Sequence, residues 1–89
     1  MHVKYHFRLY TLGKTNRFSV ALTNLTKLCN QKLKDQYQIE VVDLNENIQL
    51  AEDNHIWATP TIERLTPEPV MRIIGDLSDE DTIVQAMIL

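Results

Sequence analysis

The stretch IWATPTIERLTPEPVMRIIGDLSDED, residues Ile56 to Asp81, decides the fold of this 89-residue chain. All three prolines of the chain lie within it, and the two short apolar runs TIERL and VMRII each follow a proline. Proline is tolerated at the start of a strand and is common in turns. The stretch therefore predicts a β-hairpin in which TPTIERL is one strand, TPEP is the turn and VMRII is the second strand.

The same part of the chain also allows a second interpretation. PVMRIIGD, residues 69–76, equally suits a short helix with proline in its first turn and glycine after its end. The terminal segment TIVQAMIL, residues 82–89, is apolar and β-branched enough to form a strand. Because short apolar runs do not distinguish strand from helix, the pattern alone leaves both interpretations open.

The residues before this stretch predict a βαβ unit. From Val3 to Leu9 apolar and polar side chains alternate as in a strand, and the apolar residues beyond it indicate a central position. After the turn GKTN, with Thr15 or Asn16 as the helix cap, apolar side chains recur at helical spacing from Phe18 to Leu33. IEVVDL, residues 39–44, is apolar on both faces, which is typical of a buried parallel strand.

Two helices complete the expected order of elements. A short helix is predicted within residues 45–55, and a terminal helix beginning at Ser78 has acidic residues in its first turn. The order βαβαββα predicts an α/β, thioredoxin-like fold. We expect one domain spanning residues 1–89, which is just large enough for a single core.

Composition and charge exclude several classes of function. The formal net charge is −3 with both signs interspersed, so the chain offers no basic surface for nucleic acid or for an anionic membrane. No apolar run approaches the roughly 20 residues of a membrane span, and the N-terminus has no signal-peptide core. The single cysteine, Cys29, excludes an intrachain disulfide. We therefore expect a cytoplasmic protein.

The sequence contains no arrangement of catalytic or metal-binding residues. A thioredoxin enzyme needs Cys-x-x-Cys at the start of its first helix, where this chain has LGKTNRFS. Cys29 falls on the apolar stripe of that helix, which predicts a buried thiol. The histidines His2, His6 and His55 lack metal-ligand spacing and are predicted to lie on the surface. The prediction is a protein that is not an enzyme and has no cofactor and no metal.

Two features of the decisive stretch stay undecided on the residues alone. Trp57 is a candidate for either the core or an interface anchor. The Thr59–Pro60 bond is a candidate cis peptide, because thioredoxin-like proteins commonly have one before the third strand and a cis X–Pro bond costs little. A trans proline that opens a strand is the more frequent alternative.

Several segments together resemble the KaiB family of bacterial clock proteins. FRLYTLG is similar to the first strand and turn of that family, and IEVVDLNENIQLAEDNHIWATPTI is similar to its second strand, short helix and Thr-Pro-Thr segment. PEPVMRIIGDLSDED matches the proline turn and the Ile-Ile-Gly-Asp-Leu-Ser run of the family. The resemblance runs without gaps over nearly the whole chain.

The resemblance implies a non-enzymatic regulator that binds the ring ATPase KaiC. Family members have a ground-state fold, often tetrameric, and a rare thioredoxin-like fold that binds KaiC. On the ring they sequester KaiA, displace the sensor domain of the kinase SasA and engage the kinase CikA. The implied partners are therefore a KaiC-type ATPase, proteins of the KaiA, SasA or CikA type and, as a dimer or tetramer, further copies of the chain. The region that changes fold in the family corresponds to residues 50–89.

The resemblance also assigns roles to individual residues. The positions that match the partner-binding surface of the family are Tyr5, Gln38, Glu40, His55 and Arg72. The positions that belong to the fold-changing segment are Pro60, Pro67, Pro69, Gly75, Ala86 and Ile88. Each partner-binding position is equally compatible with a solvated or packed residue that has no contact role.

The chain departs from the family at some of these positions. Glu40 and His55 stand where clock members usually carry lysine, which removes positive charge from expected contacts with KaiC and KaiA. Three alternatives therefore stay open: a sensor domain of a SasA-type histidine kinase, a KaiB-like timer or stress-response component without a full clock, and a degenerate thioredoxin with residual redox or transferase activity.

The first testable prediction concerns the C-terminal segment. Ala86 replaces a family glycine, and alanine favours a helix over glycine by about 1 kcal/mol. We expect this chain to populate the thioredoxin-like state more than clock members do. Backbone amide chemical shifts should then report helix over residues 80–88, and strand shifts there would contradict the prediction.

Overall fold

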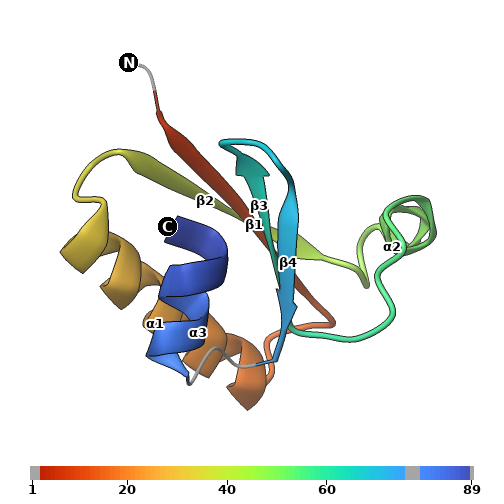
Figure 1. The fold of residues 1–89 in the computed structure, drawn as a ribbon. Coiled ribbons are helices and arrows are strands. Elements are labelled where there is room, and N and C mark those ends of the chain that lie inside the picture. The colour runs from red at the N-terminus through yellow and green to blue at the C-terminus, as the bar shows by residue number, and fades with distance from the viewer. Residues whose placement is uncertain (1–2, 76–78, 89) are drawn as a thin grey trace.

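A four-stranded sheet with helices against its two faces organises the chain. The computed structural model describes residues 3–75 and 79–88. In chain order the elements are β1 (Tyr5–Thr11), α1 (Asn16–Lys32), β2 (Tyr37–Asp43), α2 (Ile48–Asp53), β3 (Thr61–Thr66), β4 (Met71–Ile74), α3 (Glu80–Ile83) and the π-helical turn η1 (Val84–Ile88). Figure 1 shows α1 and α3 on one side of the sheet and α2 displaced toward the other side.

The strand order β2-β1-β3-β4 places β1 inside the sheet, as the sequence predicted. β1 pairs in parallel with β2 and antiparallel with β3, and β3 and β4 form the predicted hairpin. Residues 71–74 are a strand and residues 80–88 are helical. The structure therefore agrees with the first interpretation of the C-terminal half, a β-hairpin followed by a terminal helix. The predicted helix start at Ser78 lies outside the described residues.

The prediction that residues 39–44 form a strand buried on both faces is wrong. β2 is an edge strand that pairs with β1 alone in the described part of the sheet. Val41 is 44% exposed, and Glu40 is exposed on the other face. The β-branched composition of β2 gave no information on its place in the strand order, because parallel pairing alone does not require burial of both faces.

The main core lies between the sheet and the helices α1, α3 and η1. Thr15 caps α1 as predicted, since its hydroxyl accepts the Phe18 N–H at 3.1 Å. The predicted apolar stripe of α1 then packs on the sheet. The buried members of this core are Phe7, Leu9, Ala21, Leu25, Leu28, Cys29, Ile62, Ile83 and Met87. Truncating one of the larger members to alanine typically costs about 2–5 kcal/mol of stability.

A smaller core lies at one end of the opposite face of the sheet. Tyr10, Leu44 and Ile56 are buried there against Val42 and residues 50–51 of α2. The predicted short helix is therefore present, but none of its side chains is fully buried. α2 covers only one end of this face and leaves the remainder of the sheet open.

The prolines of the decisive stretch bracket β3. The Thr59–Pro60 bond, whose isomer the sequence left open, is cis, and Pro60 is buried immediately before the strand. The Thr66–Pro67 and Glu68–Pro69 bonds in the hairpin turn are also cis. Gly75 ends the hairpin with φ +123°, a backbone conformation that favours glycine, and its N–H donates to the Pro60 carbonyl at 2.9 Å. Of the remaining positions assigned to the fold-changing segment, Ala86 and Ile88 are half-buried on η1.

The terminal helical segment is held by polar contacts as well as by its apolar side chains. The Asp79 carboxylate accepts hydrogen bonds from the Thr82 N–H at 3.3 Å and the Thr82 hydroxyl at 2.8 Å, and these bonds lower the pKa of Asp79. The Tyr5 hydroxyl donates to the Ile88 carbonyl at 3.0 Å. The first turn is therefore capped locally by Asp79, and the last turn is bound to Tyr5 of β1.

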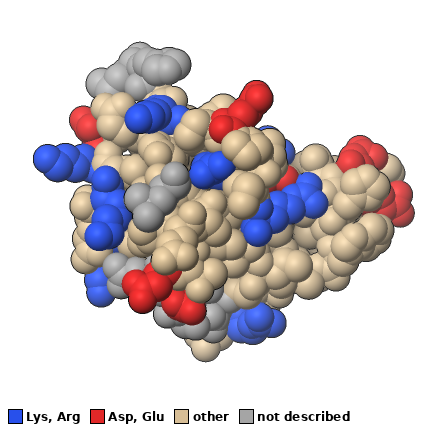
Figure 2. Space-filling view, in the orientation of Figure 1, with Lys and Arg blue, Asp and Glu red and all other residues tan. Residues whose placement is uncertain are grey.

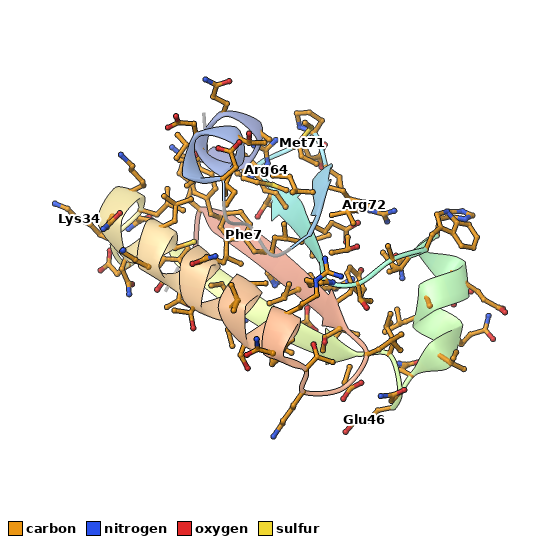
Figure 3. All side chains as sticks on the ribbon, turned by 90° about the horizontal axis from the view of Figure 1, so that it is seen from below. Phe7, Lys34, Glu46, Arg64, Met71 and Arg72 are labelled. Carbon is orange, nitrogen blue, oxygen red and sulfur yellow. The ribbon has the colours of Figure 1, made fainter. Side chains whose placement is uncertain are left out.

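Arg64 connects this segment to the hairpin from within the core. Its side chain points to the helix-covered face of β3, where the residue is 7% exposed. One guanidinium nitrogen, Nη1, donates to the Met87 carbonyl at 3.0 Å, and Nη2 donates to the Pro69 carbonyl at 2.7 Å. A cation beside the carbonyls of a helix C-terminus is favourably placed. Figure 3 shows Arg64 directed toward the terminal helix and Arg72 directed away from it.

We predict that Arg64→Lys lowers the free energy of unfolding by about 1.5–3 kcal/mol, because a lysine ammonium does not span both carbonyls and one charge-assisted hydrogen bond is lost. Urea titration measures the change, and hydrogen exchange should show reduced protection over residues 79–88. Arg17→Lys, an exposed exchange of the same kind on α1, is the control and should leave both measurements unchanged. Equal stability of the two variants would show that the bridge is not needed.

Candidate functional site

Charged side chains of alternating sign cross the sheet on the face opposite to α1, which we call the open face. In the strand register Arg8 is the partner of both Glu40 and Glu63, and Glu63 is the partner of Arg72. Residues in register across a sheet point to the same face. The four strands therefore carry a row of acid, base, acid and base from β2 to β4, which we call the charge row.

Hydrogen bonds link the charge row through the Tyr10 hydroxyl. Arg8 donates from Nε to Glu40 Oε1 at 3.0 Å and from Nη1 to the Tyr10 oxygen at 3.2 Å. The Tyr10 hydroxyl donates to Glu63 Oε1 at 3.0 Å, and Arg72 Nε donates to Glu63 Oε2 at 2.7 Å. Each element of the sheet thus contributes to one connected network.

Burial differs between the inner and outer members of the charge row. The Glu63 side chain is 4% exposed, whereas those of Glu40 and Arg72 are 45% and 37% exposed. Burial raises the pKa of Tyr10, and the hydrogen bond from Arg8 to Tyr10 is the main cause that raises the pKa of Arg8. Tyr10 therefore stays a neutral donor and Arg8 stays a cation near neutral pH. The buried inner groups fix the positions of the side chains in the charge row, and the outer charges of Glu40 and Arg72 remain accessible to a partner.

His6 lies on the surface only in part, because its side chain is 35% exposed and its Nε2 atom is buried. It is half-buried on the open face, with Nε2 3.9 Å from Glu40 Oε1 and without a hydrogen-bond partner within the described residues. His55 is exposed, as predicted, and His2 lies outside the described residues. Over the described ranges no three side chains of His, Cys, Asp or Glu gather at a distance suited to a metal ion.

The structure brings together four of the five residues assigned to partner binding. Gln38, Glu40 and Arg72 lie on the open face, and the His55 carbonyl accepts from Arg72 Nη1 at 3.4 Å. Tyr5 does not join them. Its ring stacks on Phe7 on the helix-covered face, with 6.0 Å between ring centroids.

Sequence reasoning missed the centre of the charge row. Arg8, Tyr10 and Glu63 were assigned no site role, although a signal existed, since Glu63 interrupts the apolar run TIERL. A carboxylate in the middle of a strand needs a partner when it is buried. That the partners are Tyr10 and Arg72 depends on the strand order, which the sequence pattern did not contain.

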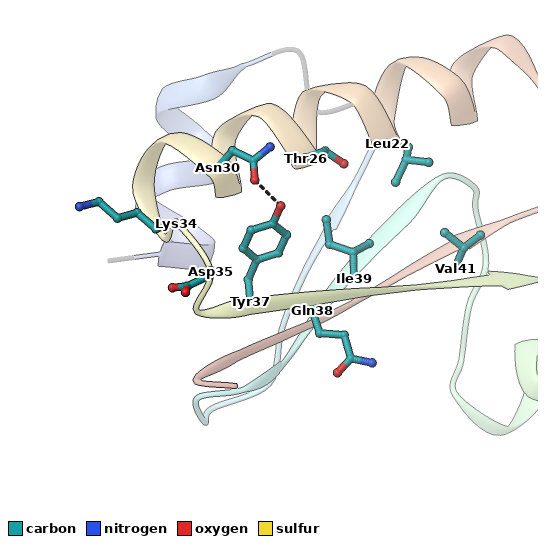
Figure 4. Close-up of a pocket in the computed structure, with 9 residues that line it drawn as sticks. All are labelled: Leu22, Thr26, Asn30, Lys34, Asp35, Tyr37, Gln38, Ile39 and Val41. Carbon is teal, nitrogen blue, oxygen red and sulfur yellow. Dashed lines mark hydrogen bonds between the residues drawn. The ribbon is translucent and has the colours of Figure 1, made fainter. Parts of the chain in front are cut away.

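A groove lies between α1 and the edge strand β2 (Figure 4). Its volume is about 670 Å³. Leu22 and Thr26 line it from the helix, and Ile39 and Val41 line it from the strand. The hydroxyl of Tyr37 donates across one end of the groove to the Asn30 carboxamide oxygen. Lys34 and Asp35 also line the groove, so its lining is partly charged.

The position of the thioredoxin active site is chemically different here. The loop before α1 reads LGKT, and the Gly13 N–H donates to Asp43 Oδ1 at 3.1 Å. Cys29 lies on α1 with no exposed surface, as predicted, and burial raises the pKa of its thiol to about 12. A thiol with so high a pKa is almost entirely protonated near neutral pH and is a poor nucleophile.

The surface charge is mixed. Figure 2 shows Lys and Arg interspersed with Asp and Glu on the face that it views, and acidic side chains at the end of the molecule formed by α2. In the part of the chain that the structure describes, no helix is long and apolar enough to cross a membrane.

Comparison with known protein families identifies the family of this chain. The model of the KaiB domain matches residues 8–88. This chain belongs to the KaiB family. A circadian clock oscillator protein KaiB of Prochlorococcus marinus is 42% identical over 80 residues, which are 90% of this chain and 68% of the relative. A circadian clock protein KaiB3 of Synechocystis is 39% identical over 77 residues, which are 86% of this chain and 76% of the relative.

Solved structures show that this KaiB-family chain has the predicted thioredoxin-like fold. The N-terminal domain of Synechococcus elongatus SasA aligns with a TM-score of 0.78 at 15% identity, over 96% of this chain and 82% of that chain. Mitochondrial thioredoxin 3 of Saccharomyces cerevisiae aligns with a TM-score of 0.70 at 17% identity, over 93% and 79% of the two chains. At these identities the likeness concerns the fold alone.

The state of Cys29 gives a third test. We predict that a thiol-specific disulfide reagent leaves the native protein unmodified at neutral pH and modifies it at one site per chain after denaturation, because the thiol is buried and protonated. The measurement is the absorbance of the released chromophore with and without urea. Rapid modification of the native protein would contradict the buried position and would reopen redox chemistry as a function.

Proposed function

We propose that this chain is a non-enzymatic regulatory protein that binds a KaiC-type ring ATPase and alters its timing cycle by recruiting or displacing other proteins. The observation that carries the proposal is the match of the KaiB domain to residues 8–88. Relatives at about 40% identity are named as circadian clock proteins. The geometry adds a candidate contact surface in the charge row of the open face.

The charge row suits protein recognition better than it suits catalysis. Its inner carboxylate Glu63 and the linking Tyr10 hydroxyl have their hydrogen bonds satisfied within the sheet. Glu40 and Arg72 present one negative and one positive charge at the two sides of the face. Exposed charges at an interface mainly set the rate and specificity of association, and a fixed pair of opposite charges orients a partner.

The fold supports competition with a SasA-type kinase for the same ATPase. The SasA N-terminal domain has the same fold over 96% of this chain. Two proteins with a common fold can occupy one docking site in turn, and the chain that is bound then excludes the other. Recruitment of KaiA- or CikA-type proteins, a cytoplasmic location and self-association to a dimer or tetramer are further parts of the proposal.

A change of fold over residues 50–89 is also part of the proposal. The structure has the packing of its thioredoxin-like neighbours, in which the hairpin is formed and the terminal segment is helical. The alternative packing would exchange the states of residues 69–76 and 82–89, the two runs whose sequence is compatible with both strand and helix.

Two alternative functions share this fold. The likeness to the SasA domain also suits a sensor domain of a histidine kinase, and departures such as Glu40 suit a KaiB-like timer or stress-response component. The KaiB-domain match over residues 8–88 and the relatives at about 40% identity favour the proposed ATPase-binding regulator over a kinase sensor domain, because the likeness to SasA at 15% identity concerns the fold alone.

Size-exclusion chromatography with light scattering tests the proposal. The chain is run alone and after prolonged incubation with a KaiC-type hexamer and nucleotide, and slow co-elution is expected. A stable free chain with no co-elution would contradict binding to this class of ATPase, and a kinase or another ring ATPase would then be the partner to examine.

A charge exchange on the charge row tests the surface. Glu40→Lys restores the lysine that clock members usually carry, and we expect association with a clock KaiC several-fold faster at low salt. Glu46→Lys makes the same change of charge at an exposed position outside the charge row and serves as the matched control. Equal association rates for the two variants would exclude the open face from the interface.

A further inference from the structure

Trp57 has the largest exposed fraction among the large hydrophobic side chains that the structure describes. It is 81% exposed, compared with 71% for Ile48 and 65% for Ile74. A tryptophan brings about 150–250 Å² of surface that is favourable to bury, and tryptophan is one of the residue types enriched at interface hot spots. The sequence left open whether Trp57 belongs to the core or to an interface, and its exposure excludes the core.

The backbone on both sides of Trp57 is fixed. Ile56 is buried, and its N–H donates to the Ala51 carbonyl at 2.8 Å. On the other side the Thr61 hydroxyl donates to the Ala58 carbonyl at 2.6 Å. A side chain presented from a fixed backbone loses less conformational entropy on binding than one on a mobile loop.

Trp57 is continuous with the charge row through its neighbours. Its ring lies 6.0 Å from the His55 ring, centroid to centroid, at an interplanar angle of 46°. The His55 carbonyl accepts from Arg72 Nη1 at 3.4 Å, and Arg72 is the outer cation of the charge row. An exposed aromatic side chain beside a polar rim is the usual arrangement of an interface centre.

We propose that Trp57 is the anchor residue by which this chain docks on its partner ATPase. The inference rests on the proposed function and specifies the partner chemistry. The partner presents an apolar socket for the indole, with a carboxylate or carbonyl oxygen at its edge for the half-exposed Arg72 guanidinium. The continuity of Trp57 with the charge row favours this partner over a second copy of the chain.

Fluorine NMR of the chain labelled with fluorotryptophan tests the inference directly. Trp57 is the only tryptophan of the chain, so the label reports on one position even beside an unlabelled hexamer that contains tryptophan. The KaiC-type hexamer with nucleotide should shift and broaden the single resonance. The Trp57→Ala variant should keep the far-ultraviolet circular dichroism of the native chain and bind at least roughly 30-fold more weakly.

Val20→Ala provides the matched control. Val20 is an apolar residue of α1, on the opposite side of the sheet, and is 38% exposed. Its truncation should leave the affinity unchanged.

The outcomes separate this inference from the proposed function. Co-elution with the hexamer, an unshifted resonance and unchanged affinity of Trp57→Ala would overturn the anchor role while the proposed function stands. Absence of co-elution for the native chain would overturn both. A resonance that shifts when the chain alone is concentrated, with a dimer mass by light scattering, would assign Trp57 to contact between copies and overturn the docking role.

Discussion

The pairing of β1 with two neighbours is the constraint on which the rest of the structure depends. β1 is hydrogen-bonded to β2 in parallel and to β3 antiparallel, so every residue of the strand is committed to one face or the other. Phe7 and Leu9 face the helices, and Arg8 and Tyr10 face the open side. A shift of one residue in either pairing would place Arg8 in the core and Phe7 in water. The pairing of β1 therefore determines at once which side chains lie in the core and which lie on the open face.

The same alternation sets the roles of two adjacent charged residues on β3. Glu63 faces the open side and joins the charge row, whereas Arg64 faces the core and donates to the carbonyls of Met87 and Pro69. Both side chains are almost fully buried, so each needs its hydrogen bonds to offset the cost of desolvation. One strand thus fixes the charge row on one side and the terminal helix on the other.

Local patterns in the sequence predicted the elements of this fold but not their neighbours. The alternation in β1, the stripe of α1 and the prolines around β3 depend on residues close in the chain, and each of these elements was confirmed. The edge position of β2 and the burial of the His6 ring nitrogen depend on contacts between strands distant in sequence. For the same reason Glu40 and Arg72 were assigned by family resemblance, whereas Arg8, Tyr10 and Glu63, which connect them, were missed.

The helical state of the terminal segment depends on few contacts. α3 has four residues and η1 has five, well below the roughly 12–15 residues at which an isolated helix becomes marginally stable. Its helical state must therefore come from tertiary contacts. Those contacts are the burial of Ile83 and Met87, the bond from Tyr5 to the Ile88 carbonyl, and the bridge from Arg64. Each contributes a few kcal/mol at most, which is the scale of the difference between two conformations that one protein can populate. The pattern of TIVQAMIL did not decide between strand and helix, because the groups that hold the helix lie on β1 and β3, far away in the sequence.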